Sequence, residues 1–167
     1  RLMLQVFIRR NKKIIYEGLA VNDAVVSKGA IARIVNIRVD VDNAFASMVR
    51  ADGLILSTPT GSTAYSVAAG GPIVSPKMDC MILTPICGHG LTQRSMVIPS
   101  SSKVTVKLDQ IPGHVYLTVD GQEAVDLKDG DEIEVRQFTK HRLKLVQSPT
   151  RDFFMLLREK LNFGGKV

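Results

Sequence analysis

Short segments in which apolar and polar residues alternate run through most of this chain, and they limit its fold more than any other feature. The clearest begins at Val35, where apolar side chains occupy every second position as far as Val41. Such alternation gives a strand one apolar face and one polar face. Turn residues separate these segments about every 8–12 residues, a spacing typical of two packed sheets. The pattern predicts a mainly β protein with a distorted, β-sandwich-like architecture.

Most of the chain is expected to lie in strands. The expected strands are residues 2–8, 13–17, 20–26, 35–41, 45–49, 54–57, 81–85, 104–108, 115–119, 123–127, 133–136 and 142–146. The strand at residues 20–26 contains an interruption at Asn22-Asp23. Turn residues at Asn11-Lys12 and Asp120-Gly121 are expected to close two hairpins.

Two helices are expected, one inside the chain and one at its end. The internal helix is short and covers residues 63–69, with Ser62 as its N-cap and Gly70 just after its last turn. The second covers residues 152–161, where apolar residues recur at helical spacing. We therefore divide the chain into an all-β domain, residues 1–151, and a C-terminal helical tail, residues 152–167.

Composition excludes several classes of protein. The 167 residues suit one domain, and no apolar run is long enough to cross a membrane. Cys80 and Cys87 match no disulfide framework or zinc motif, so both are expected to be buried thiols. The three histidines are widely separated, so we expect no metal site built from protein ligands alone. We expect a cytoplasmic location, and the first residue, Arg1, suggests a processed chain or part of a longer one.

An uncharged segment interrupts this basic chain, whose net charge is +6. No charged residue occurs between Gly53 and Pro76, although the segment is rich in Gly, Ser and Thr. Gly61 would let a ligand approach the backbone, nearby hydroxyls could bind sugar or base edges, and Tyr65 could stack on a ring. Ser/Thr-rich turns are also common without any ligand. Composition alone leaves both interpretations open.

The order of residues in this segment is more specific than its composition. Residues 51–76 read ADGLILSTPTGSTAYSVAAGGPIVSP, and LTPIC and VIPSSSKV follow. Together with Asn22-Asp23 and the segment VDGQ at residues 119–122, they closely resemble the C-terminal domain of the NAD kinase family. The resemblance extends from about residue 19 to the end of the chain.

The resemblance implies a set of residues that bind NAD. Asn22 and Asp23 would contact a ribose and the amide of the dinucleotide, and Tyr65 would pack on a base. Asp52 would reach the ligand of a neighbouring subunit. The complete set is Asn22, Asp23, Arg33, Arg50, Asp52, Thr63, Ala64, Tyr65, Ser66, Val67, Ala68 and Gln122. His89 stands between glycines where relatives have Pro-His-[Ser/Thr], so we expect it to be structural.

An activity is implied by the same resemblance. Members of the family transfer a phosphoryl group from ATP or polyphosphate, with Mg²⁺ on the donor phosphates, to the adenosine ribose 2′-hydroxyl of NAD. Their presumed base belongs to a G-G-D-G motif in an N-terminal α/β domain. No G-G-D-G occurs in this sequence, so we expect residues 1–151 to bind NAD without a catalytic residue or a metal ligand. The tail would pack on the α/β domain, and the chain would form a dimer or tetramer.

Two other functions compete with this one. A lipid kinase of the same superfamily would accept a lipid hydroxyl, but Thr63-Ala64-Tyr65 argues against it. A non-enzymatic β-sandwich module could use the basic balance to bind nucleic acid. The basic residues are dispersed, aromatic residues make up only 5% of the chain, and no RNA-binding aromatic motif occurs. We therefore expect neither a nucleic-acid partner nor a membrane partner.

Overall fold

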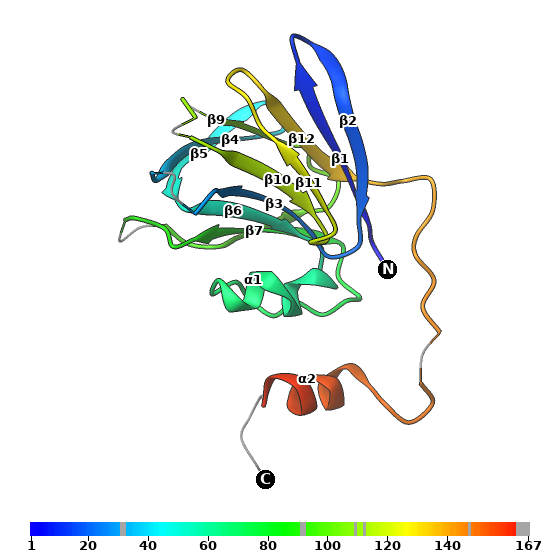
Figure 1. Cartoon of the computed structure of the whole chain (residues 1–167). Helices are drawn as coiled ribbons and strands as arrows, with labels where there is room; N and C mark the ends of the chain where they lie inside the picture. Colours follow the sequence, from blue (N-terminus) through cyan, green and yellow to red (C-terminus); the bar gives the residue numbers. More distant parts are fainter. Residues whose placement is uncertain (31–32, 91–92, 109, 112, 147, 163–167) are drawn as a thin grey trace.

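Two antiparallel sheets packed face to face form the body of the protein in a computed structural model (Figure 1). The structure describes residues 1–30, 33–90, 93–108, 110–111, 113–146 and 148–162. The first sheet has the strand order β2 (Lys13–Ala20), β1 (Leu4–Arg10), β12 (Glu132–Gln137), β9 (Val104–Leu108), β4 (Val35–Val41) and β5 (Ala44–Ala51). The second has the order β11 (Glu123–Asp126), β10 (Val115–Val119), β3 (Asp23–Lys28), β6 (Gly53–Ser57), β7 (Cys80–Ile86) and β8 (Met96–Pro99).

The core lies between the two sheets. Alternate residues of each strand point into it, as the period of two requires. Leu4 and Ile8 enter it from the first sheet, and Leu54 and Leu56 enter it from the second, each at most 1% exposed. The prediction of a mainly β, sandwich-like fold is confirmed.

The chain crosses between the sheets where a single strand, interrupted at Asn22-Asp23, was expected. The expected strand at residues 20–26 is wrong as a single element, because β2 ends at Ala20 in the first sheet and β3 begins at Asp23 in the second. Val21 and Asn22 make the crossing. We call residues 21–23 the crossover.

Two further strand predictions need correction. Residues 142–146 form no strand; they follow β12 outside both sheets, and Val146 is fully exposed. The edge strand β8 was missed, because Pro99 argues against a strand by lacking an N–H. An edge tolerates this residue, since one side of the strand needs no partner.

The internal helix is shorter than expected and begins differently. A 3₁₀ turn, η1 (Gly61–Thr63), precedes a single helical turn, α1 (Tyr65–Ala68). Ser62 is not an N-cap, because its hydroxyl bonds the backbone of Pro59 and Val74 instead. The prediction that Gly70 follows the helix is confirmed, and its φ of +86° suits glycine.

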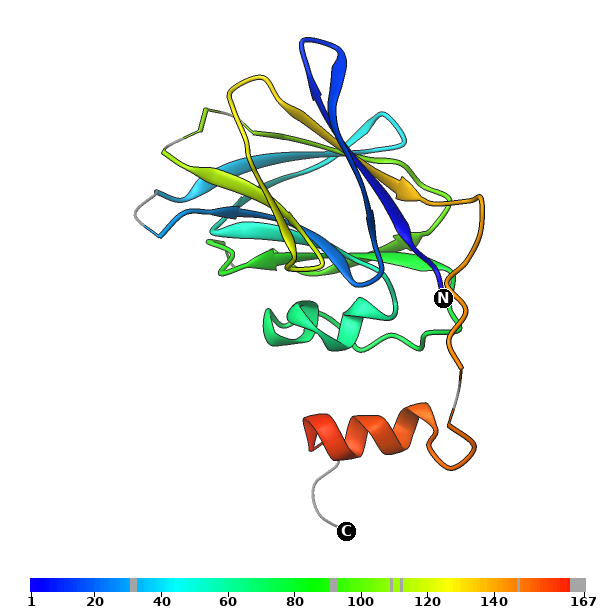
Figure 2. The same ribbon diagram turned by 45° about the vertical axis from the view of Figure 1, so that its right-hand side comes forward.

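The C-terminal helix α2 (Phe153–Leu161) is confirmed. The side chain of Asp152 caps it by accepting a hydrogen bond from the Met155 amide at 2.7 Å. Figure 2 shows α2 outside the two sheets, on the same side as α1, at the end of an extended segment that leaves β12. Residues 163–167 of the expected tail lie outside the described residues.

The two cysteines differ in their exposure. Cys80 is buried, as expected, and both thiols are free. The expectation for Cys87 is wrong, because it is exposed in the loop after β7, with a φ of +47°.

Candidate functional site

The crossover is bound to a hairpin that is distant in sequence. The carboxylate of Asp120, in the turn between β10 and β11, accepts hydrogen bonds from three consecutive backbone amides. These amides belong to Val21 (2.8 Å), Asn22 (2.7 Å) and Asp23 (3.0 Å). The amide of Asp120 in turn donates to the carbonyl of Asp23 at 2.9 Å. A single side chain thus supplies partners that the crossover lacks as it changes sheets.

Thr58, immediately after β6, binds the crossover from the other side. Its hydroxyl donates to the carbonyl of Val21 at 2.6 Å and accepts from the amide of Gly61 at 3.0 Å. Its amide donates to the carbonyl of Asn22 at 2.8 Å. Gly61 lies so close to Asn22 that a Cβ atom would overlap the Asn22 carbonyl. The crossover and the η1 turn are therefore packed directly together.

Two hydroxyls of the uncharged segment are used inside the protein. Ser62 is fully buried, and its hydroxyl donates to Pro59 and accepts from the amide of Val74. Ser66 is also fully buried, and its hydroxyl lies 2.9 Å from that of Thr84 on β7. Ser66 therefore joins α1 to the second sheet, and Ser62 joins η1 to the loop at Val74.

The exposed side of this segment is formed by other residues. Tyr65 is 46% exposed, and Ala64 and Ala68 are exposed beside it. Thr63 and Val67 are half-buried. The surface that α1 presents is uncharged, with one aromatic ring.

Asp23 is the most unusual ionisable residue near the crossover. It is only 5% exposed, and burial, followed by repulsion from Asp120, raises the pKa of its carboxyl group to about 6. Among the described residues, no hydrogen bond reaches this carboxylate. Ser57, its partner in the β3–β6 register, has a buried hydroxyl that is also without a partner in the described part of the chain. Two buried polar groups without partners therefore occupy adjacent strands.

Part of the predicted set comes together at this end of the second sheet. Asn22 and Asp23 start β3, and Gln122 is exposed in the hairpin that carries Asp120. Residue 63 ends the η1 turn, which packs on Asn22, and residues 64–68 follow it. We call Asn22, Asp23, Gln122 and residues 63–68 the candidate site.

The rest of the predicted set lies elsewhere. Asp52 precedes β6, whereas Ser57 ends it, so the five-residue strand separates Asp52 from the candidate site by roughly 17 Å. Its carboxylate lies 3.4 Å from the ammonium group of Lys28. Arg50 is an exposed residue near the end of β5, two positions before Asp52, and Arg33 is exposed just before β4. Within one chain these three residues do not join the candidate site.

Sequence reasoning missed Asp120 and Thr58 as site residues. Asp120-Gly121 was interpreted as a hairpin turn and as part of the VDGQ segment, and Thr58 as part of the uncharged, family-like segment, but neither residue was assigned a role at the site. A buried strand followed by an acidic turn residue is a weak signal that Asp120 binds distant backbone. The contacts of Asp120 with Val21 and Asn22 span nearly 100 positions, as sequence separations of 99 and 98 show, and no local pattern records them.

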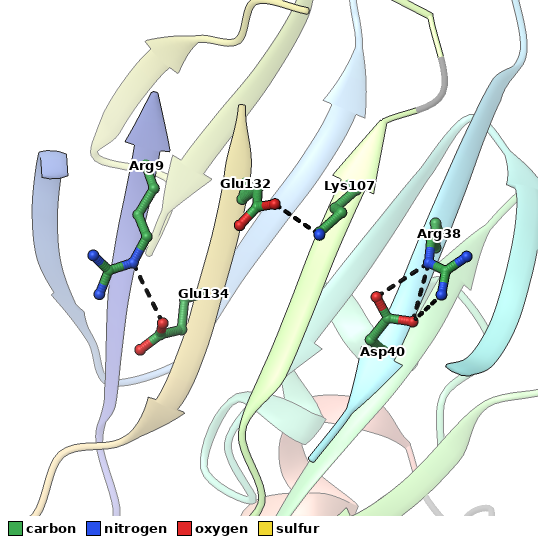
Figure 3. A network of polar contacts seen from close by, with 6 residues as sticks. All are labelled: Arg9, Arg38, Asp40, Lys107, Glu132 and Glu134. Carbon is green, nitrogen blue, oxygen red and sulfur yellow. Dashed lines mark hydrogen bonds and ion pairs between the residues drawn. The ribbon is translucent and has the colours of Figure 1, made fainter. Parts of the chain in front are cut away.

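Two open depressions on the surface are lined by residues of the first sheet and its turns, away from the candidate site. One, of about 270 Å³, is on the outer face of the first sheet. Figure 3 shows ion pairs across this face, including Arg9–Glu134 at 3.5 Å and Lys107–Glu132 at 2.7 Å. Opposite charges alternate there and are paired with each other, which is typical of a solvent-facing sheet.

Neither a metal cluster nor a membrane helix is found in the part of the chain that the structure describes. No three His, Cys, Asp or Glu residues are grouped there so as to hold a metal ion. None of its helices is long and apolar enough to cross a membrane.

Comparison with known proteins gives a consistent result. The family model for the ATP-NAD kinase C-terminal domain matches residues 21–148. The NAD kinase of Acidobacterium capsulatum is 49% identical over 166 residues, and that of Geobacter sulfurreducens is 48% identical over the same length. Each alignment covers 99% of this chain but 58% of the relative, so the chain spans less than two thirds of these proteins.

Solved structures agree with the sequences. The yeast NADH kinase complexed with NADH superposes with a TM-score of 0.92 at 34% identity, covering all of this chain and 49% of that one. An NAD kinase from Archaeoglobus fulgidus in complex with ATP gives a TM-score of 0.67 at 27% identity, over 83% of this chain and 51% of that one. The family match, the relatives and the fold agree: this chain belongs to the NAD kinase family and corresponds to its C-terminal domain.

Proposed function

We propose that this chain binds the dinucleotide substrate of an NAD kinase and positions it for phosphoryl transfer. One observation carries the proposal: the crossover, the Gln122 hairpin and the α1 segment meet at one end of the second sheet. They come from three separate parts of the sequence, and each contains residues that the family resemblance implies. The yeast relative, which is similar over the whole chain, was solved with NADH.

The chemistry of these residues suits a dinucleotide. Asp23 offers carboxylate oxygens that no donor occupies among the described residues, and ribose hydroxyls are suitable donors for them. Asn22 has an amide that can both donate and accept. The exposed ring of Tyr65 can pack against a base, since its face is accessible.

The absence of charge from Gly53 to Pro76 also fits this ligand. A dinucleotide carries negative phosphates, which carboxylates beside them would repel. The acids at the crossover and its hairpin are Asp23 and Asp120, and three backbone N–H groups hold the carboxylate of Asp120. The uncharged surface of α1 can therefore lie beside the phosphates of the dinucleotide without repelling them.

The reaction we propose is transfer of a phosphoryl group from ATP or polyphosphate to the adenosine ribose 2′-hydroxyl of NAD, which gives NADP. Such transfer depends on in-line positioning and on neutralisation of charge. These residues would contribute the positioning. The sequence contains no G-G-D-G, so we propose that the 167 residues alone bind dinucleotide but do not transfer phosphate.

A divalent cation enters the proposal only with the phosphate donor. The described residues contain no cluster of ligands suited to it. We therefore assign Mg²⁺ to the donor phosphates, where it would neutralise negative charge, and assign no residue of this chain to it.

A second copy of the chain would complete the site. Asp52 lies about a strand length from the candidate site, so it could reach the same ligand only from a neighbouring chain. We propose the same arrangement for Arg33 and Arg50. We propose a dimer or tetramer in which Asp52 of one copy serves the dinucleotide bound by another.

The helical tail has a separate role in the proposal. The rings of Phe153 and Phe154 pack edge to face, and Phe154 is still 64% exposed. An exposed aromatic residue beside a partly buried stripe indicates a surface that packs on another structure. We propose that α2 packs on the family's α/β domain.

Calorimetric titration of the chain with NAD, NADP and vesicles that contain diacylglycerol tests the proposed function. We expect NAD and NADP to bind, each with one site per chain, and the vesicles to give no signal. Binding to diacylglycerol vesicles without binding to dinucleotide would instead indicate a lipid kinase. Absence of binding to both dinucleotides would contradict the proposal.

A further inference from the structure

Asp120 and Thr58 together hold the crossover from both sides. Between them they bind three successive amides, from Val21 to Asp23, and the carbonyls of Val21 and Asn22. We call these two residues the clamp. Two residues thus bind five consecutive backbone groups, in the segment that carries Asn22 and Asp23.

The clamp replaces the hydrogen bonds of a sheet. A chain that leaves one sheet for another loses its strand partners, and buried backbone groups without partners are costly. A carboxylate can accept several N–H bonds at once, and such charge-assisted bonds are strong. Asp120 therefore fixes the backbone direction at Asn22 and Asp23, which decides where their side chains point.

We propose that Asp120 is a positioning residue for dinucleotide binding, which acts by holding the backbone of Asn22 and Asp23 and by joining it to the Gln122 hairpin. Thr58 performs the matching role on the side of η1 and α1. The inference rests on the proposed function, and it assigns these two residues a part in binding without contact with the ligand.

The alternative is that the clamp contributes only to the stability of the fold. A matched control variant distinguishes this role from a role in binding. Asp42 also accepts a backbone hydrogen bond across a turn, from the amide of Lys103 at 2.8 Å, but in the turn between β4 and β5 of the first sheet. Asp42→Asn therefore weakens a comparable carboxylate–backbone contact away from the candidate site.

The test measures Kd for NAD and Tm for Asp120→Asn, Asp42→Asn and the unchanged chain. Asparagine keeps one acceptor oxygen but places an amide donor against the remaining backbone donor. We expect Asp120→Asn to weaken NAD binding about tenfold or more, since loosening of a binding residue by about 1 Å is costly. We expect Asp42→Asn to lower Tm similarly and leave Kd unchanged.

A second pair of variants tests the clamp from the other side, including the case in which Asp120→Asn does not fold. Thr58→Val keeps the shape but loses the hydroxyl, whereas Thr58→Ser keeps the hydroxyl. We expect Thr58→Val to weaken binding and Thr58→Ser to restore it. In either folded clamp variant, amide hydrogen exchange should accelerate at Val21–Asp23 more than elsewhere.

Contradicting outcomes are distinct. An unchanged Kd for NAD in Asp120→Asn or Thr58→Val would overturn the clamp's role in binding while the proposed function stands. Uniform acceleration of exchange across the protein would overturn it as well. Failure of the unchanged chain to bind NAD would overturn the proposed function, and this inference with it.

Discussion

At the scale of single residues, Asp23 combines burial with an absence of hydrogen bonds among the described residues. Burial and the neighbouring Asp120 raise the pKa of its carboxyl group to about 6. A carboxyl group in such an environment destabilises the folded protein and commonly belongs to a functional site. The ionised form accepts the stronger, charge-assisted hydrogen bonds from a ribose.

Affinity for NAD should therefore depend on pH. Below about pH 6 the Asp23 carboxyl group of the free protein is protonated, so we expect Kd to rise as pH falls from roughly 7.5 to 5. NAD is the suitable ligand for this measurement, because the 2′-phosphate of NADP itself titrates at about pH 6. Asp23→Asn should bind weakly at every pH and show little pH dependence. Equal slopes for the two proteins in calorimetry would contradict this role of Asp23.

The same pKa makes a prediction about stability without ligand. The folded pKa lies above the ordinary value of 3.8, so the folded protein holds more protons between these values. The contribution of Asp23 to the free energy of unfolding thus falls as pH rises from about 4 to about 6. We expect Asp23→Asn to raise the free energy of unfolding at pH 7 by roughly 1–3 kcal/mol, measured by urea denaturation.

Asp131 provides the opposite control. Burial opposes its charge, but hydrogen bonds from Arg10 and from the amide of Lys128 outweigh burial and lower its pKa. Asp131→Asn should therefore reduce stability at pH 7, where Asp23→Asn raises it. Loss of stability in both variants would show that Asp23 is a structural residue.

At the scale of elements, η1 depends on its contact with the crossover. A Cβ atom at Gly61 would overlap the Asn22 carbonyl, and the nearby atoms are backbone, which cannot move easily. We expect Gly61→Ala to cost about 2–3 kcal/mol and to weaken NAD binding, because the crossover must shift. Urea denaturation and calorimetry measure the two effects.

Gly70→Ala is the matched control for that substitution. Gly70 has a positive φ, but no atom lies within 4 Å of the place that a Cβ atom would take, so the cost is conformational alone. We expect a loss of about 1 kcal/mol with unchanged NAD affinity. A Gly61→Ala protein that binds NAD normally would disprove the link between η1 and the crossover.

Strands of the core could be predicted from sequence because burial of one face imposes a period of two. β4 has the predicted bounds, Val35–Val41, since each of its core positions is a valine or isoleucine. The crossover could not be predicted, because Ala20 and Ala24 are buried in different sheets but continue one alternation. Ser62 was predicted as a cap from local residues, whereas its hydroxyl binds Val74, twelve positions away.

The candidate site likewise has residues that local motifs predict and residues that only distant contacts reveal. Asn22, Asp23, Gln122 and residues 63–68 were named from motifs, and the structure brings them to one end of the second sheet. Asp120 and Thr58 were not named, because their contribution is to hold distant backbone. Motifs indicate side chains that are suited to a ligand, but only the fold shows which residues support them.

At the scale of the whole molecule, the proposal of a shared site can be tested by mixing variants. Asp23→Ala and Asp52→Ala chains should each bind NAD weakly. In a mixed dimer, one of the two sites would have both aspartates intact, so refolding the variants together should restore part of the binding. Calorimetry measures it, with light scattering to report assembly. No recovery in a mixture that does assemble would contradict a site built from two copies.

The central claim is that the dinucleotide lies between the crossover, α1 and the Gln122 hairpin. Backbone amide NMR shifts recorded during titration with NADP test it most directly, because they report every part of the surface at once. We predict the largest changes at Asn22, Asp23, Tyr65 and Gln122, and small ones on the outer face of the first sheet, at Arg9 and Glu134. The largest changes on that outer face, with none at the crossover, would contradict the account.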